Sequence, residues 1–316
     1  MSPRLLCVGT AVVDLVADLP GSLEVGAKQF APALRTVVGG PATTAAAAAA
    51  RLGAEVLLVA PVGDDDRAGT VRAALVDAGV EDALVVRPGA ATATSLVLVT
   101  PDGERTIVNA TPDALRGPLD PDDAAALRAA VAAADAVLAD VRWPAAAALA
   151  LAAARSAGVP GVLDLDRAPA GDHGLVTGLV RAASHVAASQ DGLDDLLAVH
   201  RPGLTVDADL GAALAALEEL AGGAVPLVTL GSSGGAWRTG GVLATAPAPA
   251  VAVVETLGAG DVWHGALAAG LAAGRTVADA VADANAAAAL RCTRRGGWET
   301  LADAAEVAAL RARERA

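Results

Sequence analysis

The hydrophobic positions of the chain fall into two kinds of segment that alternate along its length. Short apolar runs, typical of buried strands, predict strands at 5–9, 34–38, 56–60, 83–87, 136–139, 161–165, 184–188, 225–230 and 250–254. Ala- and Leu-rich stretches between them predict helices, among them 41–53, 71–78, 261–273, 277–291 and 303–314. This alternation predicts an α/β fold, in which a doubly wound, mostly parallel sheet carries helices on both faces.

One early region departs from this rhythm. The strand-like segments 95–100 and 104–109 flank Pro101-Asp102-Gly103, which is a hairpin signal. A second glycine-rich β segment is predicted at 231–245. We therefore expect one large domain over residues 1–316, with a small antiparallel β appendage formed by about 11–38 and 91–110.

Composition narrows the class of protein. The 316 residues carry 36 acidic against 23 basic side chains, a net charge of −13, which argues against a nucleic-acid binder or a polybasic membrane-surface protein. Asp14 and Asp18 interrupt the first apolar stretch, and the longest apolar run, 143–154, is too short to span a membrane. Cys7 and Cys292 are too few for a disulfide framework. We expect a soluble cytoplasmic protein.

The sharpest chemical signal is a turn of small residues late in the chain. An apolar strand is predicted to lead into Gly258-Ala259-Gly260, and a helix is predicted to begin at Asp261. Small residues let backbone amides converge at a helix N-terminus, where the helix dipole favours an anion such as phosphate. Asp261 would then be placed to take a proton from an attacking hydroxyl. The alternative is a tight turn in which Asp261 only caps the helix.

A second turn, Gly39-Gly40-Pro41, precedes an Ala-rich helix, and its paired glycines permit close approach of a ligand. Together the two turns resemble the signatures of the PfkB (ribokinase-like) carbohydrate kinases, which carry Gly-Gly before an early helix and later Asp-Thr-x-Gly-Ala-Gly-Asp. Residues 255–261 read Glu-Thr-Leu-Gly-Ala-Gly-Asp and match at all but the first position. Segments 228–234 and 289–297 resemble the family's nucleotide-side blocks, and the four blocks occur in the family's order.

The resemblance implies ATP-dependent phosphorylation of a sugar hydroxyl, with Mg²⁺ carried by ATP. It makes Asp261 the base, and the amides of Gly258, Ala259 and Gly260 would stabilise charge on the transferring group. The hairpin segments would form a lid through which two copies pair as a homodimer. Sugar contacts are expected at Asp14, Gly39 and Gly40, and nucleotide contacts at Thr229, Gly231, Gly234 and Asn285.

Two positions depart from the family pattern. Glu255 stands where the family has Asp, which bears on how a cation is organised nearby. The family's Asn-x-x-Glu element is expected near Ser189, but residues 189–192 read Ser-Gln-Asp-Gly. The metal ligands therefore stay unassigned.

The identity of the sugar rests on three polar residues. Lys28 is the sole lysine, Asn109 is one of two asparagines, and Arg142 follows a predicted strand. Two cations and an amide would suit an anionic substituent. With Gly39-Gly40-Pro41-Ala42, Asp140-Val141-Arg142-Trp143 and Gly265, they resemble the sulfofructose kinases, which phosphorylate the 1-hydroxyl of 6-deoxy-6-sulfofructose. A neutral ketohexose, as in fructokinases or ketohexokinases, is the alternative substrate.

Three other readings compete with a sugar kinase. A P-loop needs Gly-Lys-Ser/Thr, but Lys28 lies between Ala27 and Gln29. The run 231–235 fits the nucleophile elbow of an α/β hydrolase, with Asp261 and His264 downstream, yet the elbow needs a helix directly after Ser233, where β structure is predicted. A catalytically silent sugar-binding protein on the same fold stays open.

Overall fold

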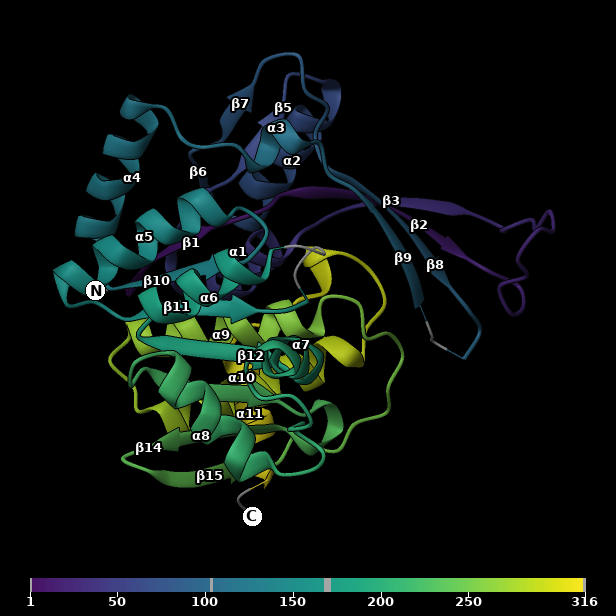
Figure 1. Cartoon of the computed structure of the whole chain (residues 1–316). Helices are drawn as coiled ribbons and strands as arrows, with labels where there is room; N and C mark the ends of the chain where they lie inside the picture. Colours follow the sequence, from purple (N-terminus) through teal and green to yellow (C-terminus); the bar gives the residue numbers. More distant parts are fainter. Residues whose placement is uncertain (1, 103–104, 168–171, 315–316) are drawn as a thin grey trace.

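A computed structural model describes residues 2–102, 105–167 and 172–314 of the chain. Its centre is a nine-stranded sheet in the order β15-β14-β13-β12-β11-β10-β1-β4-β6 (Figure 1). Its strands are β1 (Arg4–Val8), β4 (Glu55–Val59), β6 (Glu81–Asp82), β10 (Ala136–Asp140), β11 (Gly161–Leu165), β12 (His185–Ser189), β13 (Val225–Thr229), β14 (Gly235–Thr239) and β15 (Val242–Ala246). All pair in parallel except β14 and β15, so the α/β prediction is confirmed.

Helices cover both faces of this sheet, which explains why its strands are apolar without alternation. In β1, Leu5 and Cys7 point into one core and Leu6 and Val8 into the other. The first core is closed by α1 (Pro41–Arg51), α2 (Asp66–Ala78), α9 (Ala259–Ala272), α10 (Val277–Cys292) and α11 (Ala304–Glu314). The second is closed by α4 (Pro121–Ala133), α5 (Pro144–Ala157), α6 (His173–Ala182), α7 (Gln190–His200) and α8 (Leu210–Leu220). Short elements complete the fold: α3 (Asp113–Arg116), β5 (Pro61–Gly63) and β7 (Val85–Arg87).

Helices α1 and α9 pack with their backbones in close contact. A Cβ atom at Gly265 would lie 2.2 Å from the carbonyl oxygen of Ala45, so only glycine fits at this crossing. The Ala-rich run of α1 therefore serves close packing. This packing holds the glycine turn before α1 and the small-residue turn before α9 side by side, and Thr44 of α1 reaches Gly258.

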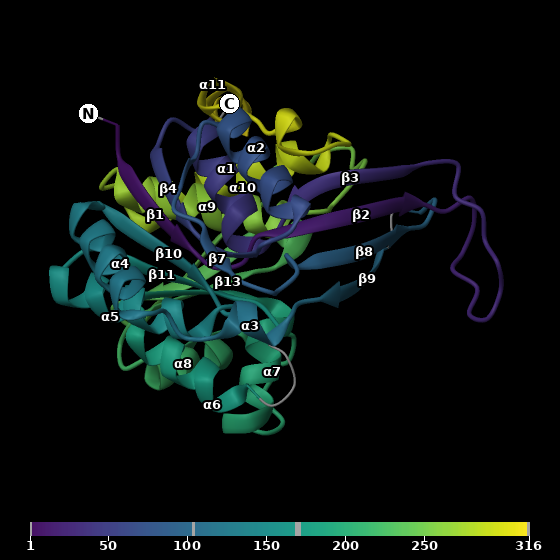
Figure 2. The same ribbon diagram turned by 90° about the horizontal axis from the view of Figure 1, so that it is seen from above.

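A four-stranded sheet, the lid, projects from the body (Figure 2). Its order is β3 (Leu34–Gly39), β2 (Val12–Asp18), β8 (Thr94–Val99), β9 (Arg105–Ala110). The pairs β2–β3 and β8–β9 are antiparallel, and the central pair β2–β8 is parallel, since these strands come from two separate excursions of the chain. The lid core is small and consists of Val16, Val97 and Val99, with Val37 and Leu257 packed against them.

Three local predictions differ from the structure. Residues 250–254 form no strand, because they find no neighbour to pair with, and the Val254 amide instead donates to the carbonyl of Cys292 (2.8 Å). The predicted strand at 83–87 is divided, with β6 ending at Asp82 and β7 beginning at Val85. The late helix begins at Ala259, two residues before the predicted start. Within the described residues, no helix is long and apolar enough to cross a membrane.

Candidate active site

Two cavities meet at the carboxyl ends of the parallel strands, beneath the lid. The first, the acidic cavity, has a volume of about 350 Å³ and contains the carboxylates of Asp14, Asp164, Asp166 and Asp261. The second, the apolar cavity, has a volume of about 620 Å³ and is walled mainly by small and apolar residues of segments 248–253 and 285–292. The residues that line both are Arg105, Thr229, Thr256 and Gly260. A group at this boundary can reach both cavities.

Asp261 lies in the first turn of α9 and lines the acidic cavity. Burial and the nearby Asp164 carboxylate raise the pKa of Asp261 to about 7, against a smaller opposing effect of His264. A carboxylate with this pKa is poised to accept a proton near neutral pH. The position and the electrostatics of Asp261 suit a general base.

The turn before Asp261, which we call the anion loop (residues 258–260), has the backbone that small residues allow. Gly258 is the N-cap residue of α9 and has a φ of +74°, a conformation that L side chains rarely adopt. Gly260 is exposed and lines both cavities. The amide of Ala259 donates to the carbonyl of Thr256 (3.2 Å), so one of the three amides predicted to face a phosphate is engaged in the turn itself.

The glycine pair of the early turn makes room for Asp14. A Cβ atom at Gly39 would lie 2.3 Å from Asp14 Oδ2, and one at Gly40, where φ is +100°, would lie 2.2 Å from the carbonyl of Thr10. Burial raises the pKa of Asp14 to about 6, although the neighbouring Ser95 hydroxyl acts in the other direction. Asp14 and Gly40 line the acidic cavity together with Asp261, and Gly39 lies against the Asp14 carboxylate.

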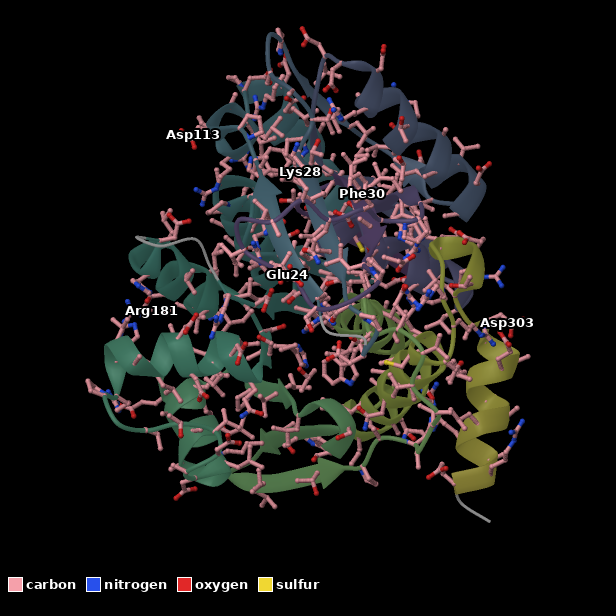
Figure 3. The ribbon with its side chains drawn as sticks, turned by 90° about the vertical axis from the view of Figure 1, so that its right-hand side faces the viewer. Glu24, Lys28, Phe30, Asp113, Arg181 and Asp303 are labelled. Atoms are coloured by element: carbon pink, nitrogen blue, oxygen red, sulfur yellow. The ribbon has the colours of Figure 1, made fainter. Side chains whose placement is uncertain are left out.

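Of the three residues expected at an anionic substituent, two line the acidic cavity. Asn109 accepts a hydrogen bond from Ser95 (2.8 Å), and Arg142 donates to Asp166 (3.1 Å). Lys28 does not join them, because it is exposed on the loop between β2 and β3, outside the residues that line the cavity (Figure 3). The expected group of three is therefore not assembled within one chain.

All four residues expected at the nucleotide line the apolar cavity, namely Thr229, Gly231, Gly234 and Asn285. The amide of Asn285, however, serves the wall of the cavity. Its oxygen accepts from Trp263 Nε1 (2.8 Å), and its nitrogen donates to the carbonyls of Ala246 (2.9 Å) and Pro247 (3.1 Å). Asn285 shapes the cavity while its own hydrogen-bonding groups are already used.

The sequence reading missed several polar residues of the site. Asp164 is the fourth residue of β11 and Asp166 directly follows this strand. Buried His264 places Nδ1 3.4 Å from Asp164 Oδ2 and Nε2 3.2 Å from the carbonyl of Ala187. Burial lowers the pKa of His264 and raises that of Asp164. Ligands of parallel sheets bind beyond the carboxyl ends of the strands, so acidic residues there were the available signal.

Asp140, at the end of β10, fixes the backbone next to the acidic cavity. Its carboxylate accepts hydrogen bonds from the amides of Thr10 (2.8 Å), Ala42 (3.3 Å) and Arg142 (2.8 Å). These bonds join the segment after β1, the start of α1 and the loop after β10. Asp140 is therefore a brace for the backbone around the acidic cavity.

The fold excludes the α/β-hydrolase alternative. Residues Gly231–Ser233 form a single 3₁₀ turn and lead directly into β14, so no helix follows Ser233. His264 faces Asp164 and the carbonyl of Ala187, not Ser233. No group of three His, Cys, Asp or Glu side chains able to hold a metal ion occurs among the residues that the structure describes.

An anion loop between two cavities, at the carboxyl edge of a doubly wound sheet, is typical of α/β proteins that bind phosphate groups. The profile of the pfkB family carbohydrate kinases matches residues 2–304, and the chain belongs to this family. The bifunctional protein HldE of Azorhizobium caulinodans is 36% identical over 274 residues, which are 83% of this chain and 54% of that protein. The chain thus spans about half the length of this curated relative.

Solved structures agree in fold over the whole chain. A protein of Agrobacterium tumefaciens, provisionally named a ribokinase, is 30% identical with a TM-score of 0.89, and each chain covers 100% of the other. The ribokinase of Arabidopsis thaliana, solved with ribose and ATP, is 25% identical with a TM-score of 0.80, over 98% of this chain and 99% of that one.

Proposed function

We propose that this protein transfers the γ-phosphoryl group of ATP to a hydroxyl group of a sugar bound in the acidic cavity. The observation that carries the proposal is the position of Gly260 and Asp261, with the anion loop at the boundary of both cavities and the carboxylate on the acidic side. ATP would occupy the apolar cavity. The similar Arabidopsis ribokinase, which holds ribose and ATP, supports this assignment.

The reaction then needs one proton transfer and one displacement. The Asp261 carboxylate takes the proton of the sugar hydroxyl, the oxygen attacks the γ-phosphorus, and the bond to the bridging oxygen of ADP breaks. The N-terminus of α9, with the amides of Gly258 and Gly260, stabilises the charge on the transferring group. ADP leaves from the apolar cavity, and Asp261 returns its proton to solvent.

A magnesium ion would enter with the nucleotide. Mg²⁺ in such sites is held by substrate phosphates, water and one or two carboxylates, without a protein cage. The described residues fit this mode, since carboxylates line the acidic cavity but no cluster of three ligating side chains is present among them. The ion would neutralise phosphate charge during the transfer.

For the sugar itself, we propose the 1-hydroxyl of 6-deoxy-6-sulfofructose as the acceptor. Arg142 and Asn109 line the same cavity as Asp14 and Asp261, and a guanidinium with an amide suits a sulfonate. A neutral ketohexose is the second candidate, favoured by a specific contact. Asp166 already pairs with Arg142, so this cation is matched without a charged ligand.

We also propose that two copies pair through the lid. The strand β9 is exposed along its whole length, and Leu34, Leu96, Ile107 and Val108 present apolar side chains on the lid. A second copy would cover this surface, and Phe30 on the β2–β3 loop is similarly exposed (Figure 3). Light scattering should give a dimer for the wild type and a monomer for Val108→Glu; a wild-type monomer would contradict the pairing.

The proposed function is tested by a screen of sugars with ATP and Mg²⁺. ADP release and ³¹P NMR of the product should identify a sugar phosphate for sulfofructose or for a neutral ketose. Failure of every ketose, sulfosugar and phosphosugar, with a folded protein that binds ATP, would favour a silent sugar-binding protein. The position of the new phosphate on the sugar decides the acceptor hydroxyl.

A further inference from the structure

The end of helix α10 carries a buried positive charge. Arg291, in the last turn of this helix, is 4% exposed. Its guanidinium group donates hydrogen bonds to Glu255 Oε1 (2.7 Å) and to the carbonyl oxygens of Arg294 (2.6 Å) and Gly296 (3.1 Å). A buried guanidinium has lost its hydration and needs such acceptors. We call these three oxygen atoms the oxygen cage.

The backbone that carries the oxygen cage has supports other than the Arg291 side chain. The amides of Val254 and Glu255 both donate to the carbonyl of Cys292 (2.8 and 3.2 Å), which ties the segment before the anion loop to the end of α10. In the loop after α10, the guanidinium of Arg294 donates to the carbonyl of Thr300 (2.9 Å). Truncation of the Arg291 side chain should therefore leave the three oxygens in place.

The oxygen cage requires a cation. Glu255 is 5% exposed, so its carboxylate is largely cut off from water, and the carbonyls lie at the C-terminal end of α10, where the helix dipole is negative. Carboxylate and carbonyl oxygens are also the ligands that hard metal ions take. Arg35 and Arg295 pair with the other carboxylate oxygen, Glu255 Oε2 (3.3 and 3.9 Å). Inside the cage, the positive charge comes from Arg291.

The residues present do not fit a metal ion in the oxygen cage. Glu255 stands where the family pattern has Asp, a position that bears on how a cation is organised nearby. Here the nitrogens of Arg291 bind the three oxygens directly, at 2.6–3.1 Å, which leaves no space for an ion between them. A side chain occupies the place that an ion would need.

We propose that the guanidinium group of Arg291 is a built-in cation, which takes the place of a monovalent metal ion beside the anion loop. The charge lies close to this loop, since Arg291 lines a small cavity of about 50 Å³ together with Gly258 and Asp261. A group tethered to the chain has a high local concentration that does not vary with the medium. The folded state and its activity then require neither K⁺ nor Na⁺. The inference goes beyond the proposed function, because stability tests it without any substrate.

The test compares thermal unfolding in KCl and in tetramethylammonium chloride at equal ionic strength, because tetramethylammonium is too large for the cage. The wild type should have the same Tm in both salts. Arg291→Ala leaves the oxygens without a cation and opens space for K⁺. Its Tm should be lower than that of the wild type in tetramethylammonium and should rise saturably with K⁺, by about 2–6 °C.

Two variants are matched controls. Arg291→Met removes the same charge but fills the space with a long side chain, so its Tm should be lowered in both salts without rescue by K⁺. Arg295→Met removes a 54% exposed charge beside the same carboxylate and should behave as the wild type. Together they separate loss of charge in the cage from loss of charge near it.

A wild type whose Tm or turnover rises saturably with K⁺ would overturn the proposal. So would an Arg291→Ala variant with the same Tm in both salts, or equal rescue of Arg291→Met by K⁺. If Arg291→Ala is unfolded in both salts, Arg291→Lys decides, because it keeps a charge in the cage. A folded Arg291→Lys protein indifferent to K⁺ supports the built-in cation, and one stabilised by K⁺ contradicts it. Failure of every sugar to react would overturn the proposed function and leave this inference standing.

Discussion

The two adjoining cavities differ in the chemical character of the side chains that line them. The acidic cavity is lined by many ionisable side chains, namely Asp14, Arg105, Arg142, Asp164, Asp166, Asp261 and His264. The apolar cavity has a single charged lining residue among those described, Arg105, and otherwise backbone, small and apolar side chains. The acidic cavity can therefore choose its ligand by matching charges and hydroxyls, whereas the apolar cavity can choose only by shape and backbone contacts.

This difference indicates that proton transfer takes place in the acidic cavity and that the apolar cavity contributes binding affinity for ATP. Charged groups in a partly buried cavity have shifted pKa values, as Asp14 and Asp261 do, and such groups serve proton transfer. A cavity of small residues holds a ligand without taking part in bond making. Substitutions on the acidic side should change turnover or sugar choice, and those on the apolar side should change the KM for ATP.

The largest effect is expected at the base. Asp261→Asn should lower kcat by about 10²–10⁴-fold, because it removes the general base, while ATP affinity stays unchanged. Steady-state kinetics and calorimetry with ATP separate these two effects. Near-wild-type turnover in this variant would remove Asp261 from the mechanism and break the assignment of chemistry to the acidic cavity.

The next effect concerns the choice of sugar. If Arg142 binds a sulfonate, Arg142→Ala loses a hydrogen bond to a charged group and should raise the KM for sulfofructose by about 10–100-fold. Activity on neutral fructose should change little. Equal losses on both sugars would indicate that Arg142 acts only through its pair with Asp166, which the structure records at 3.1 Å.

The pH profile gives a smaller effect with a defined sign. Since the pKa of Asp261 is raised to about 7, the carboxylate is increasingly protonated below this pH and cannot accept a proton. With sugar and ATP, kcat/KM should fall by about tenfold from pH 8 to pH 6. The residual activity of Asp261→Asn should lack this limb; an identical profile in that variant would assign the titration to another group.

The smallest effect is expected on the apolar side. Val251 is half-buried in the wall of the apolar cavity, and Val251→Ala removes two methyl groups from it. The KM for ATP should rise by about 5-fold, from the loss of apolar contact, with kcat and the KM for the sugar unchanged. A change in the KM for the sugar instead would exchange the roles of the two cavities.

The sequence alone determined the sheet, the lid and the anion loop. Strand and helix periods of 2 and 3.6 residues are local, so the alternation of apolar runs and Ala-rich stretches predicted the doubly wound fold. Gly258, Ala259, Gly260 and Asp261 are adjacent in the chain, and a turn of neighbouring residues can be read without knowing the fold. The local rule failed at 250–254, since an apolar run becomes a strand only where a neighbouring strand is present to pair with it.

Only the tertiary structure decided which distant side chains meet. Lys28 and Arg142 are equally basic in the sequence, yet the lid carries Lys28 outside the cavity that Arg142 lines. Glu255 is one residue in a motif until the fold brings Arg35 and Arg291 to its two oxygens, from 220 positions before it and 36 positions after it. Such long-range contacts depend on strand order and on the paths of loops, which are determined by packing across the whole chain. They are therefore not visible in the hydrophobic periodicity of the sequence.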